Sequence, residues 1–193
     1  MYEHIKFKNA INMRKANYDK FPSTKLTGML VQGWDSIISM LKKKMDARKV
    51  LAVDLYTGVY EEEVLDAFSK EFSGRVMNVR DLMKPEKEIQ TLTERFMTED
   101  VLFGYVTNLK LEDYLDADKV AAARKQISEA KETIVIIGTG AAVVAPQDAM
   151  VVYADMARWE IQQRFRRHEV KALGIDNRND AVSLQYKRGY FND

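Results

Sequence analysis

Three short apolar runs constrain the fold more than any other feature of this sequence. They are "KVLAVD" at residues 49–54, "ETIVIIGTG" at 132–140 and "AMVVYAD" at 149–155. Runs of this kind are typical of strands buried on both faces, as in a parallel sheet covered by helices. Helical patterns alternate with them along the chain. We therefore expect an α/β fold, with a three-layer, mostly parallel sheet flanked by helices.

The remaining segments complete this plan. We expect further strands at 75–83 and at "DVLFGYVT", residues 100–107. Helices are expected over 34–45, 61–72, 85–97, 116–130 and 156–169, with Asp118 and Asp155 as the caps of the last two. The tail from Lys171 is polar and carries loop signals. Residues 1–33 are polar and mixed, so we expect an N-terminal extension before a single α/β domain over 34–193.

The composition narrows the classes of function. The chain has 30 basic and 29 acidic residues, and this near balance argues against nucleic-acid binding. It has no cysteine, which excludes disulfides, thiol nucleophiles and cysteine-bound metals. The two histidines, His4 and His168, are too far apart to suggest a zinc site, so no metal is expected. No apolar stretch of about 18 residues and no secretory signal are present, so we expect a cytoplasmic protein of bacterial type without membrane contact.

The segment "VLAVDLYTGVYEEEV", residues 50–64, has the layout of a phosphate-binding strand, loop and helix. Such a loop, G-x-x-x-x-G-K-[ST], directs backbone N–H groups at phosphate oxygens and adds a lysine and a hydroxyl. Here the first glycine position falls on Asp54, and the lysine and hydroxyl positions fall near Tyr60 and Glu61. Only Thr57 and Gly58 are chemically compatible with the pattern. The sequence predicts a degenerate phosphate loop.

Three consecutive glutamates, 61–63, begin the helix after this loop. One interpretation is that they complement the positive end of the helix dipole, at about 0.3–1 kcal/mol each. They also oppose a polyphosphate, because two like charges about 4 Å apart repel by about 4 kcal/mol at an effective dielectric constant of 20. We therefore expect poor binding of a nucleotide triphosphate at this turn.

A second glycine pattern, "GTGAAV" at 138–143, resembles part of a dinucleotide fingerprint. Val143 stands at its third position, and Pro146 leaves no room for the helix that should bind the pyrophosphate. A nucleotide cofactor of the Rossmann type is therefore not expected. A tight strand exit at the ligand-binding edge of the sheet is the better interpretation.

The helix "ARWEIQQRFRRHE" is rich in arginine. Its spacing directs Arg158, Arg164 and Arg167 towards a shared region, where they could bind phosphate by bidentate hydrogen bonds. The alternative is a solvated basic face with a surface pair between Glu160 and Arg164. The apolar residues of the same helix are expected in the core: Trp159, Ile161 and Phe165.

Two aspartates end expected strands, and their role stays open. Asp54 and Asp155 could hold a magnesium ion or accept a proton. Either could equally cap a turn or a helix.

Several segments together resemble a known family. These are "GWDSIISMLKK", "VLFGYVTNLKLEDYLDADKV", "YADMARWEIQQR" and "KRGYF". They are similar to the N-terminal region of bacterial class I mannose-6-phosphate isomerase-like proteins, where this region precedes a cupin-type isomerase domain. The region itself resembles uridine-kinase-type P-loop folds with an arginine-bearing lid helix, and the likeness covers most of the chain after about residue 20.

The resemblance implies a kinase-like domain over 34–193 that lacks the residues for isomerisation and for phosphoryl transfer. The isomerase metal ligands belong to the cupin domain, and the phosphate-loop lysine and hydroxyl are missing here. The ligand contacts that remain plausible are Asp54, Thr57, Gly58, Asp155, Arg158, Arg164 and Arg167.

Three functions follow as alternatives. The first is a noncatalytic, kinase-like module of sugar-phosphate metabolism that binds a phosphorylated small molecule or an isomerase domain. The second is an active phosphotransferase in which lid arginines replace the lysine. The third is an interaction scaffold without a ligand, and an oligomer is compatible with each.

Overall fold

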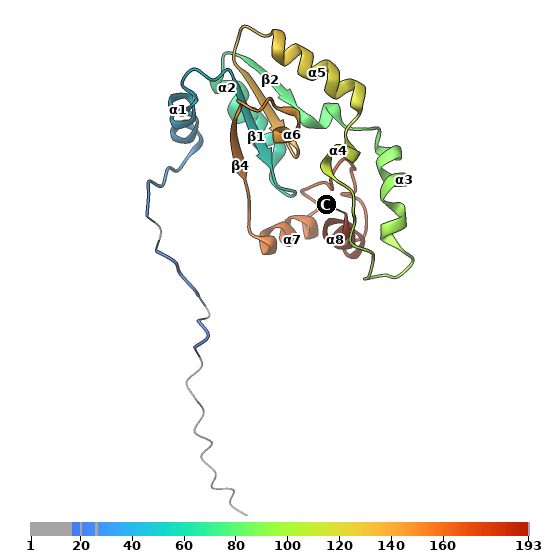
Figure 1. Cartoon of the computed structure of the whole chain (residues 1–193). Coiled ribbons are helices and arrows are strands. Elements are labelled where there is room, and N and C mark those ends of the chain that lie inside the picture. Colours follow the sequence, from blue (N-terminus) through green and yellow to red (C-terminus); the bar gives the residue numbers. More distant parts are fainter. Residues whose placement is uncertain (1–16, 20, 26, 193) are drawn as a thin grey trace, which may run out of the picture. The chain divides into compact units, whose positions relative to one another are not determined.

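The computed structural model describes residues 17–19, 21–25 and 27–192, and the chain divides into two units, 1–31 and 32–193 (Figure 1). The described part of the first unit contains no helix or strand. All named elements belong to the second unit, which is the subject of the rest of the description. Within the described residues, no helix combines the length and apolar character needed to cross a membrane.

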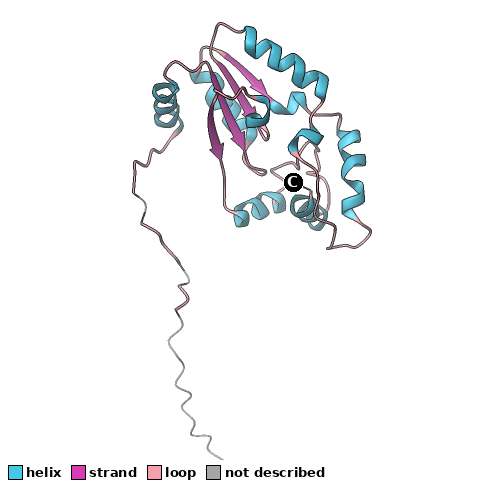
Figure 2. Cartoon of the chain, viewed as in Figure 1, coloured by secondary structure: helices cyan, strands magenta, loops and turns pink. Residues whose placement is uncertain are grey.

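A parallel four-stranded sheet forms the centre of the second unit (Figure 2). Its strands are β1 (Val50–Leu55), β2 (Arg75–Asn78), β3 (Ile134–Gly138) and β4 (Met150–Ala154), in the order β2-β3-β1-β4. All three pairings are parallel, with Val53 of β1 in register with Ile137 and Val152. The α/β class and the parallel sheet are thus confirmed, as are the strands expected from the three apolar runs.

Eight α-helices and one 3-10 helix occur in the described residues. The α-helices are α1 (Trp34–Met45), α2 (Glu61–Glu71), α3 (Glu86–Met97), α4 (Leu111–Tyr114), α5 (Ala117–Glu129), α6 (Ala141–Val144), α7 (Arg158–Arg166) and α8 (Val182–Phe191). The 3-10 helix, η1 (Val79–Leu82), follows β2 directly. Figure 1 shows α7 and α8 beyond the carboxyl ends of the strands.

Alternating side chains of the strands bury two cores, one on each face of the sheet. Leu51, Val53 and Leu55 of β1 pack with α1 and α2, whereas Val50 and Ala52 pack with α5 and α6. Every residue of β3 is buried. The edge strand β4 differs, because its odd-numbered side chains, Val151 and Tyr153, are more than half exposed. Only one face of β4 is therefore covered, contrary to the expectation of burial on both faces.

The expected strand at 100–107 is wrong, because no strand forms there. The helix caps were also misplaced: Asp116, not Asp118, accepts the N–H groups of the first turn of α5. Asp155 lies two residues before the N-cap of α7, which is Ala157, and so does not cap the helix. The segment after β3 does hold a helix, α6, but this helix has a single turn of four residues.

Near the C-terminus the burial of side chains does not follow their polarity, and the predictions for Trp159 and for residues 182–191 were wrong for this reason. Trp159 is 65% exposed, because α7 directs Ile161 and Phe165 inwards and Trp159 lies two positions before Ile161 on the opposite side. Helix α8 was not expected at all. It buries Gln185 and Lys187, so its sequence lacks the apolar period that marks a helix.

Candidate functional site

A pocket opens at the carboxyl ends of β1 and β3. The chain leaves β1 towards α2 on one face of the sheet and leaves β3 towards α6 on the other. Ligands of open α/β sheets bind at such a reversal of the chain. The cavity has a volume of about 130 Å³. Its walls come from residues 55–62, from Arg80, Met83, Gly138 and Thr139, and from residues 169–173 and Arg178.

The loop between β1 and α2 has a backbone path that requires glycine. Gly58 has φ +92°, and a Cβ atom there would lie 2.9 Å from Cγ2 of Ile161. The carbonyl oxygen of Gly58 accepts a hydrogen bond of 2.7 Å from Nη1 of Arg164. Tyr60, the N-cap of α2, provides no side-chain hydrogen bond to the first turn of the helix. The N–H groups that begin α2 are therefore left without a side-chain cap beside the pocket.

The three glutamates that begin α2 contact different partners. Glu61 accepts from Asn78 at 2.7 Å and pairs with Arg80 at 3.1 Å. The Glu62 carboxylate lies 3.7 Å from Lys171. Glu63 accepts from Nε1 of Trp34 at 2.9 Å. Each carboxylate thus has its own partner, while Glu61 and Glu62 still border the pocket.

The charges that line the pocket balance. Three carboxylates and three cationic side chains contribute to its walls: Glu61, Glu62, Glu169, Arg80, Lys171 and Arg178. Arg178 is bound to Asp176 at 2.6 Å, and this hydrogen bond lowers the pKa of the Asp176 carboxyl to about 2. The pocket is thus not the acidic site that the sequence suggested.

A network of two arginines and two glutamates connects α7 to the loop. Arg164 and Arg167 share the carboxylate of Glu160, at 3.2 and 3.0 Å, and Arg167 also binds Glu169 at 2.8 Å. The ring of Tyr60 lies 3.6 Å below the Arg164 guanidinium, and its hydroxyl donates to Glu169 at 2.5 Å. Hydrogen bonds from Arg167, above all, lower the pKa of both glutamate carboxyls.

This network predicts an acid-dependent loss of stability. A carboxyl whose pKa is lowered on folding stabilises the fold above its ordinary pKa, and that stability is lost as the pH falls through the folded-state value. We expect the free energy of unfolding of the Arg167→Met variant to fall less steeply than that of the wild type below about pH 4.5. Urea unfolding at pH 6 and at successively lower pH measures both slopes. If the free energy of unfolding falls equally steeply with pH in both proteins, Arg167 does not lower the pKa of the two glutamates, and the prediction is contradicted.

The structure brings only some of the predicted site residues together. Thr57 and Gly58 line the pocket. Arg164 and Arg167 stand behind it as parts of the network, and neither is among the residues of its walls. Arg158 turns away to the carbonyl oxygen of Gly189, at 2.8 Å, and approaches the hydroxyl of Tyr56 at 3.4 Å.

Both aspartates make backbone hydrogen bonds. The carboxylate of Asp54 accepts from the N–H groups of Gly140 and Ala142, at 3.0 and 2.9 Å, and so fastens the start of α6 to the end of β1. Asp155 accepts from the N–H of Met156 at 2.7 Å. These are the capping and turn roles that were left open as alternatives. In the described part of the chain, no group of three or more histidine, aspartate or glutamate residues could hold a metal ion.

Three cationic residues of the pocket were missed: Arg80, Lys171 and Arg178. Arg80 lies two residues after β2, and its place at the ligand-binding edge of a parallel sheet was a usable signal. Lys171 and Arg178 belong to a polar segment without periodicity, and nothing in the sequence places them near the loop. Two further cations near the C-terminus, Lys187 and Arg188 of α8, bind Thr98 and Thr93 and are not among the residues that line the pocket.

The fold and the pocket define an α/β domain with a cavity of about 130 Å³ at the carboxyl edge of a parallel sheet. A family model described as a domain of unknown function, DUF8485, matches residues 33–193. The chain belongs to this family. No curated protein and no solved structure matches the chain.

Proposed function

We propose that the pocket binds a phosphorylated small molecule, with a sugar phosphate as the favoured class, and that it does not transfer the phosphoryl group. The chain then acts as a degenerate, P-loop-kinase-like binding module. The resemblance to the N-terminal region of mannose-6-phosphate isomerase-like proteins supports sugar phosphate as the ligand and an isomerase domain as a partner.

The observation that carries the proposal is Lys171. Its side chain is 24% exposed and borders the pocket, together with the uncapped first turn of α2. Its ammonium lies 3.7 Å from Glu62 and 3.9 Å from Asp176, and it makes no hydrogen bond to any described residue. An ammonium group has three donors. Lys171 and the N–H groups of the helix terminus thus provide donors for one phosphate group.

The size and charge of the cavity favour a small, hydroxyl-rich phosphate ester. Its volume of about 130 Å³ is below the roughly 300 Å³ at which pockets for drug-sized ligands begin. A sugar phosphate suits this space better than a nucleoside triphosphate, which is much larger. The carboxylates of Glu61 and Glu169 border the same pocket, and carboxylates accept hydrogen bonds from hydroxyl groups.

The residues near the phosphate site support binding without transfer. Tyr60 and Glu61 occupy the positions of the lysine and hydroxyl, and the Glu61 carboxylate is bound to Arg80 and Asn78. Phosphoryl transfer depends on neutralising the charge of the transferred group, which a carboxylate at this position opposes. Asp54, the candidate metal ligand near the end of β1, already binds two backbone N–H groups.

Calorimetry with Lys171→Met tests the proposal. We expect mannose 6-phosphate to bind the wild type more tightly than ATP–Mg²⁺, and we expect Lys171→Met to weaken that binding by about 10- to 100-fold, as for one charge-assisted hydrogen bond. Lys125→Met is the matched control, because Lys125 is 75% exposed on α5 and does not border the pocket. It should bind like the wild type.

Other outcomes separate the alternatives. Tight ATP–Mg²⁺ binding that is lost in Arg164→Ala would favour an active phosphotransferase. No heat with mannose 6-phosphate, inorganic phosphate or ATP–Mg²⁺ would leave an interaction scaffold, and the proposal would then be abandoned.

A further inference from the structure

The loop between α3 and α4 presents an unusual set of apolar side chains to solvent. We call residues 101–106, "VLFGYV", the apolar segment. Five of its six residues are large and 63–72% exposed: Val101, Leu102, Phe103, Tyr105 and Val106. The sixth, Gly104, packs where a Cβ atom would lie 2.4 Å from the carbonyl oxygen of Phe96. The segment thus lies close against the end of α3 and exposes its side chains.

Hydrogen bonds hold the apolar segment in this position. Lys187 of α8, which is 4% exposed, donates to the carbonyl oxygens of Thr98 and Asp100 beneath it. The side chain of Asp100 accepts from the N–H groups of Leu102 and Phe103, both at 2.7 Å. Lys187 and Asp100 thus fix the conformation of the loop, so its exposed side chains are already in position before a partner binds.

The backbone of the segment has one bonded side and one open side. The N–H of Tyr105 donates to Phe96, and the N–H of Thr107 donates to Phe191, both at 2.8 Å. Gly104 and Val106, which alternate with them, make no backbone hydrogen bond within the described part of the chain. Successive N–H groups of an extended chain point to opposite sides. Residues 103–107 form no helix, turn or bend, so we expect the N–H groups of Gly104 and Val106 to lie on the side that faces away from α3 and α8.

We propose that the apolar segment is the contact between two copies of this chain, with the two segments paired antiparallel about Tyr105. The exposed surface of its side chains is on the order of 600 Å², at the top of the range for the largest apolar patch of a monomer. A standard specific interface buries about 800 Å² on each partner. The segment supplies most of that area.

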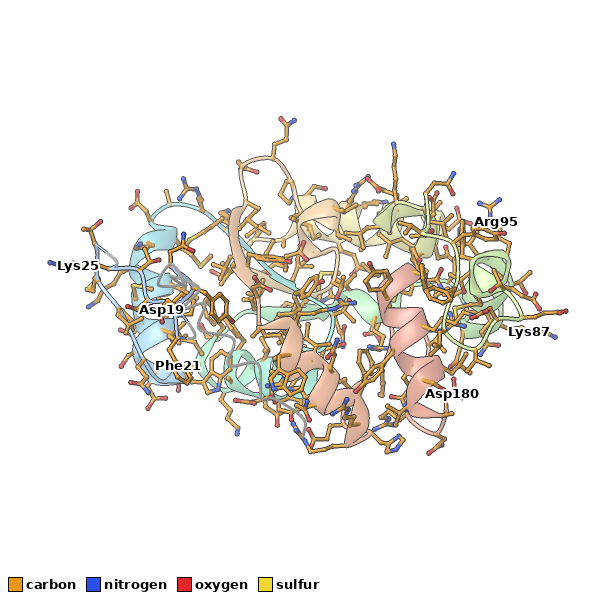
Figure 3. All side chains as sticks on the ribbon, turned by 90° about the horizontal axis from the view of Figure 1, so that it is seen from below. Asp19, Phe21, Lys25, Lys87, Arg95 and Asp180 are labelled. Carbon is orange, nitrogen blue, oxygen red and sulfur yellow. The ribbon has the colours of Figure 1, made fainter. Side chains whose placement is uncertain are left out.

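A second copy suits this surface because the segment carries no charge. In a two-fold contact the same surface meets itself, so like charges on a charged segment would lie close together and repel. Charged residues lie beside the segment, including Arg95, which projects outwards from α3 (Figure 3), and Glu99. An apolar centre with a polar rim is the usual anatomy of a protein interface.

The test uses charges of opposite sign at Tyr105, which is 68% exposed and faces its own copy in the proposed pairing. Sedimentation velocity should give twice the 22.3 kDa of one chain for the wild type. We expect Tyr105→Lys and Tyr105→Glu each to weaken self-association by about 30-fold or more. An equimolar mixture of the two variants should form dimers again, because opposite charges then meet across the two-fold axis.

Val151→Lys is the matched control, since Val151 is also a large, 54% exposed apolar residue but lies on β4. It should leave the dimer intact, and far-UV circular dichroism should show the wild-type fold in all variants. A wild type that stays monomeric at about 100 µM would overturn the proposal, as would a mixture of the Tyr105 variants that stays monomeric. Dissociation by Val151→Lys with intact Tyr105 dimers would assign the interface to β4 instead.

Discussion

Replacing Gly58 by alanine is expected to lower the free energy of unfolding by about 2–6 kcal/mol and to abolish binding of mannose 6-phosphate. Two costs add. An L-residue at φ +92° is strained by about 1–3 kcal/mol, and the new methyl group meets Ile161 at 2.9 Å, an overpacking cost of about 1–3 kcal/mol. The loop that borders the pocket then has to move, and the donors proposed for phosphate move with it. Urea unfolding measures the first effect and calorimetry the second.

Gly140→Ala separates strain from steric overlap. Gly140 has φ +90°, close to that of Gly58, but its nearest neighbour, Cγ1 of Val79, would be 4.0 Å from the added Cβ atom. This variant should lose only the strain part, about 1–3 kcal/mol. Equal losses in the two variants would show that the contact between Gly58 and Ile161 has no energetic role.

Replacing Asp54 by alanine is expected to cost about 2–3 kcal/mol of folding free energy. Hydrogen bonds to a charged group contribute about 1.5–3 kcal/mol each when buried, and Asp54 accepts two in a partly exposed position. Asp54→Asn retains one acceptor oxygen and should lose about half as much. Urea unfolding at pH 7 measures both variants.

Asp155→Ala is the matched control for Asp54, because Asp155 also lies at the carboxyl end of a strand but, among the described residues, bonds only to the N–H of the next residue. We expect it to lose less than about 0.5 kcal/mol, as for a surface substitution. An Asp54→Asn variant of unchanged stability that has lost a Mg²⁺-dependent activity would contradict the capping role and restore the metal hypothesis.

The sheet was predictable because its strands carry their own signal. β1, apart from Asp54, and β3 are apolar and buried on both faces, and β4 is also apolar in composition. The segment at 100–107 has equally strong strand propensity but forms no strand, since its bonded side meets the ends of α3 and α8 instead of another strand. Propensity predicts an extended chain, and only the tertiary partner decides whether that chain joins a sheet.

The pocket was predictable in position but not in charge. Thr57 and Gly58 were identified because the layout of a phosphate loop is local in sequence. The cations that pair with the glutamates are Arg80, which follows β2, and Lys171, which follows α7. Both are distant in sequence from the loop. Ion pairs between residues so far apart in sequence produce no periodic pattern from which they could be predicted. The acidic helix start therefore suggested repulsion where the structure has three different partners.

The most direct test of the account is a crystal structure of the chain grown with mannose 6-phosphate. The account predicts the phosphate group within hydrogen-bond distance of Nζ of Lys171 and of the backbone N–H groups that begin α2. A phosphate bound elsewhere with this pocket empty, or a nucleoside triphosphate held along residues 57–62, would contradict it.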